Sequence, residues 1–266
     1  SRVLGTAITL FFVTQAQAAT QEPPPKLDFQ SPAKAIRHLI DHYETEYPRG
    51  KEFLSRLARM ERLHASANES ETRRLARKLA ALNCEALVEC NPMLRSKTLL
   101  FTRRHPLGGQ HYAYTESLSW NRDRPRWWKP GSSLCTLSPI SPRGTVTTLV
   151  DSPTGVIRDP DVHWNGKKIL FSWKKSLNSD DYHLYELDYP SQQVTQLTKD
   201  AGFADYEGAY LPDGQIVFNS TRCVQTVDCF PVPVSNLYRC DSDGLNIHRI
   251  SVNHVHDNFP TVLNDG

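Results

Sequence analysis

An acidic phrase recurs in the second half of the chain, and its residue types are the ones best suited to chemistry. It starts at residues 159, 205 and 257, and the first two copies run directly into a segment expected to be a β-strand. Carboxylates gathered at one place can hold a cation or a cationic ligand. The candidate binding residues are Asp159, Asp161, Asp205, Glu207, Asp257 and, directly before the third copy, His256. In the alternative interpretation, each Asp caps the start of its own repeat through backbone amides.

Signatures of catalysis are missing from the sequence. It contains no G-x-S-x-G nucleophile elbow, no Walker phosphate loop, no G-x-G-x-x-G and no C-x-x-C-H haem attachment. His38 and His42 lie one helical turn apart, but they lack the intervening Glu of a zinc-protease helix and a third ligand. We therefore predict no catalytic residue, no metal site and no cofactor within this chain, and leave open whether the whole protein is an enzyme.

The cysteine spacing favours a local disulfide. Cys223 and Cys229 enclose five residues, a spacing that suits neither a zinc knuckle nor a haem attachment. A disulfide there would stabilise the loop by about 2–3 kcal/mol on loop entropy. Cys135 and Cys240 fall within strand patterns and are expected to be buried thiols.

The elements that position the acidic residues repeat with a period of about 50 residues, which is typical of propellers and solenoids. Each unit contains four short strand patterns, and the turns Asn165-Gly166, Asp213-Gly214 and Asp265-Gly266 supply residues that tolerate positive φ in hairpins. We predict a mainly β fold, a partial β-propeller of four-stranded antiparallel blades within residues 98–266. The blades cover roughly 98–150, 151–203 and 204–254, followed by the first strand of another, so the propeller is expected to be incomplete at the C-terminus. In such a fold the acidic step would face the central channel.

The first part of the chain reads differently. Residues 1–18 resemble a signal peptide, with a short apolar run and an Ala16-Gln17-Ala18 cleavage site, and residues 19–30 form a proline-rich linker. Apolar residues at helical spacing predict helices within 31–92, with a capping box at Ser66 to Glu69. The expected location is periplasmic or secreted, with no membrane span after signal removal. A net charge of only +2 gives no drive toward nucleic acid.

Several segments resemble known families. The phrase 211–218 and the step 235–244 resemble the repeats of TolB-like propellers. Residues 220–229, the segment 256–260 and the run 103–107 are similar to exported proteins related to the hydrazine synthase alpha subunit. The second resemblance implies relatives whose c-type haems attach outside the propeller repeats, but no haem ligand carries over to this chain.

Two functions follow as expectations. The first is an exported propeller that acts as a binding or scaffold module, with a protein or small ligand at its channel or loop face. The alternative is the propeller portion of a periplasmic c-type haem oxidoreductase whose cofactor motifs lie beyond this chain. Further sequence after Gly266 would distinguish them.

Overall fold

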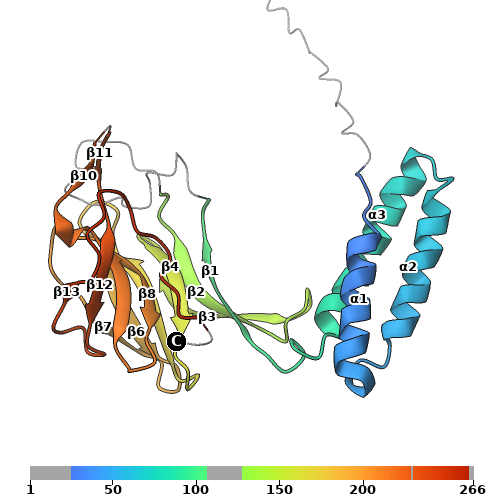
Figure 1. The fold of residues 1–266 in the computed structure, drawn as a ribbon, viewed down its shortest axis with the longest axis horizontal. Helices are drawn as coiled ribbons and strands as arrows, with labels where there is room; N and C mark the ends of the chain where they lie inside the picture. Colours follow the sequence, from blue (N-terminus) through green and yellow to red (C-terminus); the bar gives the residue numbers. More distant parts are fainter. Residues whose placement is uncertain (1–24, 107–127, 229, 264–266) are drawn as a thin grey trace, which may run out of the picture. The chain divides into compact units, whose positions relative to one another are not determined.

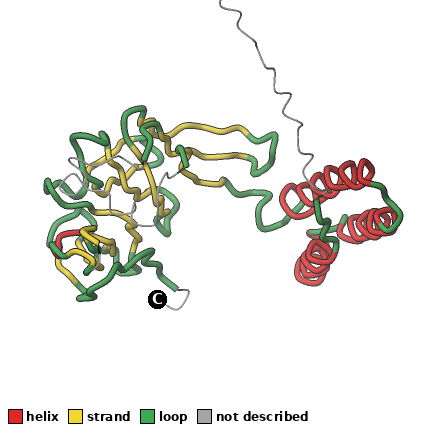
Figure 2. The backbone as a smooth tube through the Cα atoms, turned by 90° about the horizontal axis from the view of Figure 1, so that it is seen from above, coloured by secondary structure: helices red, strands yellow, loops and turns green. Residues whose placement is uncertain are grey.

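A computed structural model describes residues 25–106, 128–228 and 230–263, with only the backbone described at 230 and 231. The chain divides into two compact units, Ser1–Pro92 and Met93–Gly266. The α-helices belong to the first unit and the strands to the second (Figures 1 and 2). The predicted signal peptide at 1–18, half of the linker at 19–30 and the Asp265-Gly266 turn lie outside the described residues. Among the described residues, no helix is long and apolar enough to cross a membrane.

Within residues 25–92, the described part of the first unit, three α-helices are present: α1 (Gln30–Tyr43), α2 (Gly50–His64) and α3 (Glu69–Cys84). A 3₁₀ turn, η1 (Glu44–Glu46), follows α1, and a π-helical turn, η2 (Glu85–Glu89), extends α3. The apolar stripes read from the sequence meet in one core, which buries Ile36, Leu39, Phe53, Leu57, Leu79 and Leu82. Burying such stripes, more than helix propensity, is what stabilises helices of this length.

The capping box lies two residues later than predicted. Asn68 is the N-cap of α3, and its side chain accepts from the Glu71 amide at 3.0 Å. The Asn68 amide in turn donates to a Glu71 carboxylate oxygen at 2.9 Å. Ser66 and Glu69 were the expected pair, but Asn is as good an N-cap as Ser, and only Asn68 has an acidic residue placed to reach back.

Antiparallel sheets make up the second unit. The first has the order β1-β2-β3, with β1 (Leu99–Arg104), β2 (Ser132–Ser138) and β3 (Thr145–Ser152). The second is β4-β5-β6-β7, with β4 (Val156–Val162), β5 (Lys168–Lys174), β6 (His183–Asp188) and β7 (Gln193–Gln196). The third is β8-β9-β12-β13, with β8 (Asp205–Tyr210), β9 (Ile216–Ser220), β12 (Asn236–Cys240) and β13 (His248–Arg249). A small hairpin, β10 (Thr226–Val227) with β11 (Phe230–Pro233), and the 3₁₀ turn η4 (Thr221–Cys223) interrupt it.

The second unit is therefore mainly β, with two complete four-stranded antiparallel sheets as predicted. Alternate residues of β5 face different neighbours. Ile169 and Phe171 pack with Leu134 of the first sheet, whereas Leu170 packs with Phe218 of the third. Because side chains alternate across a strand, the middle sheet is buried on both faces. Within the described residues, the sheets form an open series and do not close into a ring.

The predicted hairpin turns are present but longer than two-residue turns. Residues 163–167 join β4 to β5, and residues 211–215 join β8 to β9. Only the glycines take positive φ, 68° at Gly166 and 86° at Gly214, and each donates its amide to the carbonyl three residues earlier. Glycine suits this last turn position because it has no Cβ to clash there.

Cys135 and Cys240 are fully buried thiols, as predicted. Cys223 has a free thiol that donates to the Val234 carbonyl at 3.1 Å. Its predicted disulfide partner, Cys229, lies outside the described residues, so the bond remains a prediction.

Candidate functional site

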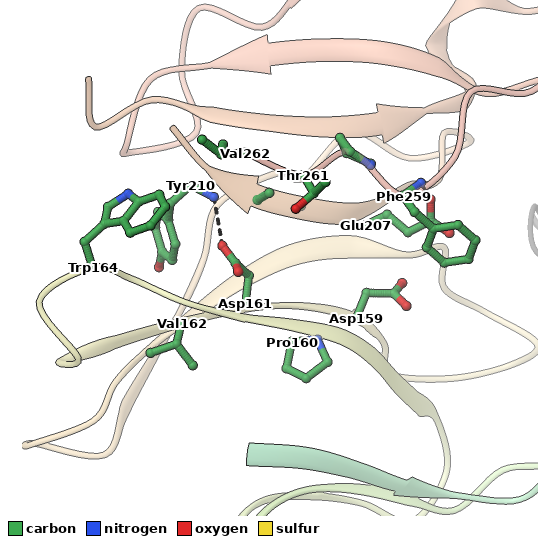
Figure 3. A pocket seen from close by; sticks show the side chains of 13 residues that line it. Asp159, Pro160, Asp161, Val162, Trp164, Glu207, Tyr210, Phe259, Thr261 and Val262 are labelled. Atoms are coloured by element: carbon green, nitrogen blue, oxygen red, sulfur yellow. Dashed lines mark hydrogen bonds between the residues drawn. The ribbon is translucent and has the colours of Figure 1, made fainter. Parts of the chain in front are cut away.

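A pocket of about 330 Å³ lies where β4, β8 and the segment 259–262 come together (Figure 3). Asp159, Asp161 and Glu207, three of the six candidate residues, line it. Trp164 stands at one end and Phe259 at the other, with the carboxylates between them (Figure 3). The first two copies of the acidic phrase thus contribute carboxylates to one site, and the third contributes an aromatic ring.

A buried arginine organises the carboxylates. Arg158, on β4, is only 3% exposed; its Nε contacts Asp159, and its Nη2 lies 2.8 Å from Glu207 Oε1. Its guanidinium carbon lies 4.9 Å from the centre of the Tyr206 ring and 5.4 Å from that of Tyr182. Cation–π contacts of this kind are strongest in desolvated surroundings. The buried guanidinium charge is therefore stabilised by the two carboxylates and by the two tyrosine rings.

The pocket carboxylates join successive repeats. Asp161 of the first copy accepts from the Tyr210 amide of the second at 2.9 Å, as Figure 3 shows. Glu207 of the second copy accepts from the Phe259 amide of the third at 2.7 Å and from the Asn219 side chain at 2.6 Å. The alternative interpretation placed each acid on amides of its own repeat, whereas these bonds reach the next one.

An unusual backbone conformation recurs at the pocket floor. Asp159, Glu207 and Phe259 have φ of 52°, 54° and 51°, in the left-handed region that non-glycine residues rarely occupy. The registers of β4 with β5 and of β8 with β9 are interrupted by a bulge at the first two of these residues. A bulge re-aims side chains next to binding sites, and here it turns the carboxylates of both strands toward the pocket.

The bulges also correct the alignment of the repeats. The sequence aligns Asp159 with Asp205 and Asp257, whereas in the structure Asp159 matches Glu207 and Phe259. Asp205 and Asp257 therefore lie two residues earlier in their repeats. Asp205 is fully buried and binds Arg222 at 2.8 Å and the Ser220 hydroxyl at 2.6 Å.

Asp257 and His256 are also outside the pocket lining. Asp257 accepts from the Asn253 side chain at 2.6 Å, and its amide donates to the Ser235 carbonyl at 2.9 Å. His256 Nδ1 accepts from the Ser235 amide at 3.3 Å. These hydrogen bonds join the segment after β13 to the start of β12, and a binding role for the two residues stays a prediction.

Burial dominates the electrostatics of the pocket acids. It raises the pKa of Asp161 above its usual value, and the hydrogen bond from Tyr210 acts in the opposite direction. Burial likewise raises the pKa of Glu207, against the lowering effect of Arg158. Burial and the nearby Glu186 carboxylate raise the pKa of Tyr210, whose hydroxyl donates to Glu186 at 2.9 Å.

Sequence reasoning missed Arg158, Trp164, Tyr210 and Phe259. A signal for Arg158 existed, because an arginine between two apolar β-branched residues and an Asp is a poor fit to a buried strand unless it is ion-paired. Within the described residues, no group of three or more His, Cys, Asp or Glu side chains could hold a metal ion. The pocket therefore offers carboxylate oxygens beside aromatic walls.

Comparison with solved structures finds partial likenesses. A TolB protein from Agrobacterium tumefaciens is 23% identical over 48% of this chain and 41% of that chain, with a TM-score of 0.39. TolB from Acinetobacter baumannii is 15% identical over 70% of this chain and 49% of that one, with a TM-score of 0.32. A puromycin hydrolase matches at 14% identity over 46% of this chain and 19% of its own, with a TM-score of 0.36. This chain thus spans less than half the length of each of these neighbours. No protein-family profile matches the chain, and no curated protein matches it significantly.

Proposed function

We propose that the second unit is a ligand-binding module of the β-propeller type, and that its pocket takes a cationic group with an apolar body, such as an alkylammonium or guanidinium. One observation carries the proposal. Asp159, Asp161 and Glu207 line one pocket together, and the exposed rings of Trp164 and Phe259 line the same pocket. Carboxylates that line one pocket can accept charge-assisted hydrogen bonds from the N–H groups of a cationic ligand.

Charge and ring placement support a cation over an anion. Three carboxylates face one guanidinium, a formal excess of two negative charges. Trp164 and Phe259 are 65% and 61% exposed at the two ends of the pocket. Aromatic faces next to carboxylates attract organic cations through the ring quadrupole and cover the apolar part of the ligand.

Calorimetric titration of the full protein with n-butylammonium and with agmatine tests the proposal, with 1-butanol as the uncharged comparison. We expect saturable binding of the amines, and a loss of about tenfold or more in Asp161→Asn, because a hydrogen bond to a charged group is removed. Asp41→Asn removes the same charge from an exposed helix position of the first unit and should leave binding unchanged. Equal binding of 1-butanol, or unaltered amine binding in the Asp159→Asn/Asp161→Asn double variant, would refute the cation site.

The alternative proposal rests on the resemblance of residues 220–229 and 256–260 to the hydrazine synthase alpha subunit group. In that case the chain is the propeller portion of a periplasmic c-type haem oxidoreductase whose haem-attachment motifs lie beyond it. A haem stain on the full-length purified protein distinguishes the two: covalent haem supports the oxidoreductase, and its absence supports the binding module.

We also propose export to the periplasm or the outside of the cell, directed by residues 1–18. N-terminal sequencing of the mature protein should then begin after Ala18. In an oxidising compartment Cys223 and Cys229 should form a disulfide, so thiol titration of the unfolded protein should gain two thiols after reduction.

A further inference from the structure

A second pocket, of about 340 Å³, lies at the end of β1 in the first sheet. We call it the cationic pocket and define it by its polar lining: Arg103, Arg104, His105, Ser132, Ser133 and Asp151. It shares no lining residue with the acidic pocket. Three consecutive basic side chains opening into one hollow of this size raise the question of what neutralises them.

Both arginines are held in place by neutral groups. Arg103 Nη2 donates to the Ser133 hydroxyl at 3.1 Å, across the β1–β2 pair where these two residues are in register. The guanidinium carbon of Arg104 lies 4.5 Å from the centre of the Trp128 ring, and Trp128 is only 3% exposed. Stacking on a buried ring fixes the plane of the guanidinium. Arg104 Nη1 also donates to the His105 carbonyl at 3.5 Å, a long contact that engages one of the five N–H donors of the guanidinium.

Neither arginine forms an ion pair with a carboxylate among the described residues. Basic side chains elsewhere in the same unit behave differently: Arg158 pairs with Glu207, Arg222 with Asp205 and Lys168 with Glu186, each at 2.8 Å. Asp151 lines the same pocket, but it forms no ion pair with either arginine. Counting Asp151, the two guanidiniums still leave the cationic pocket formally positive.

The serine hydroxyls have different roles. Ser132 Oγ accepts from the Ile157 amide at 2.7 Å and lies 3.4 Å from the Gly155 carbonyl, so it is used by the fold. Ser133 Oγ accepts only from Arg103 in the described structure, and its own O–H remains able to donate. The pocket thus presents two guanidiniums and one hydroxyl as convergent donors.

We propose that the cationic pocket binds an oxyanion, the phosphate or carboxylate group of a small ligand. Guanidinium groups match the geometry of both anions bidentately, and pre-positioned donors lose less entropy on binding than flexible surface side chains. The volume accommodates such a group with a small body attached.

Titration calorimetry of the full protein at constant ionic strength tests this, with inorganic phosphate, acetate and chloride as probes. We expect saturable binding of phosphate or acetate over chloride, and the preferred one identifies the ligand class as phosphoryl or carboxylate. Arg103→Gln should weaken binding about tenfold or more, because a charge-assisted hydrogen bond is lost. Arg104→Lys keeps the charge but loses the planar fork, and should also weaken it several-fold.

Lys199→Gln is the matched control, since Lys199 is exposed, lies outside the cationic pocket and forms no hydrogen bond or ion pair among the described residues. It removes one positive charge and should not change binding. If Lys199→Gln weakens binding as much as Arg103→Gln, the effect is general electrostatics and the site is refuted. The absence of saturable binding to all three probes, or unchanged binding in an Arg103→Gln/Arg104→Gln double variant, also overturns it. Should Arg103→Gln fail to fold by circular dichroism, Arg103→Lys replaces it with the same expectation.

Discussion

Replacing Arg158 with Met tests the central ion pair beneath the acidic pocket. Arg158 and Glu207 have side-chain exposures of 3% and 2%, so removing the guanidinium leaves the Glu207 carboxylate buried without its counter-charge. Breaking a buried pair on one side typically costs about 3–5 kcal/mol. Arg158→Met keeps most of the apolar volume, so the expected loss in unfolding free energy reflects charge rather than a cavity.

The matched control is Lys168→Met, which breaks an ion pair of the same 2.8 Å length whose lysine is 41% exposed. Exposed pairs contribute about 0–1 kcal/mol, so this variant should be nearly silent. Urea denaturation followed by tryptophan fluorescence measures both changes as shifts in midpoint at constant slope. The reasoning is refuted if Arg158→Met costs less than about 1 kcal/mol, or no more than Lys168→Met.

A second variant separates charge from packing. In Arg158→Met/Glu207→Gln the unpaired carboxylate is gone, so at least about 2 kcal/mol of the loss should return. The amide oxygen introduced by Glu207→Gln can stand where Glu207 Oε2 stands, and so still accept from the Asn219 side chain and the Phe259 amide. Full loss in the double variant would assign the effect of Arg158 to its contacts with the aromatic rings.

Three further outcomes are expected. The raised pKa of Asp161 means that the folded protein binds this proton more tightly than the unfolded chain does. The stability of the wild type should therefore fall relative to that of Asp161→Asn as pH rises from about 4 through the raised folded pKa. A pH series of urea midpoints measures this, and a constant difference between the two proteins would contradict it. Gly208→Ala places a Cβ 2.7 Å from Leu170 Cδ2 and should lower the unfolding free energy by about 1–3 kcal/mol. Part of that loss should be recovered when Leu170→Ala makes room for the new methyl group. Thermal unfolding of the single and double variants measures this, and additive losses would count against it. Asn68→Ala should destabilise the helical unit by about 1 kcal/mol in denaturation followed by helix content. Glu71→Gln should cost much less, because it keeps an acceptor for the Asn68 amide. Equal losses in the two variants would rule out the capping explanation.

The sheets were predictable because their signals are local. Ile169 to Ser172 and Ile216 to Asn219 are short apolar runs followed by further strand patterns at a fixed spacing, and both fall within paired strands. The glycines of the two described turns were predictable for the same reason. The capping box was displaced by two residues because Ser66 and Asn68 both fit the cap preference, and only the fold decides which has Glu71 in reach.

The site was harder to predict because its members are set by register. Aligning the repeats on their first Asp gives a regular acidic series, but the bulges shift the match by two residues and bring Phe259 to the third position. No sequence pattern states that Asp205 binds Arg222 while Glu207 binds Arg158, since both choices depend on which face of β8 each residue occupies. Three of the six predicted residues therefore line one pocket: Asp159, Asp161 and Glu207. The other three form hydrogen bonds outside its lining: Asp205, Asp257 and His256.

The left-handed backbone conformations of residues 159, 207 and 259 influence how the series of sheets unfolds. Each such conformation is unfavourable by about 1–3 kcal/mol in isolation and persists only where neighbours enforce it. Here Glu207 is enforced by Arg158 on one side and by the Phe259 amide on the other. Loss of any one sheet would release the strained residue of the next, so the series should melt in a single cooperative step rather than unravel from its ends.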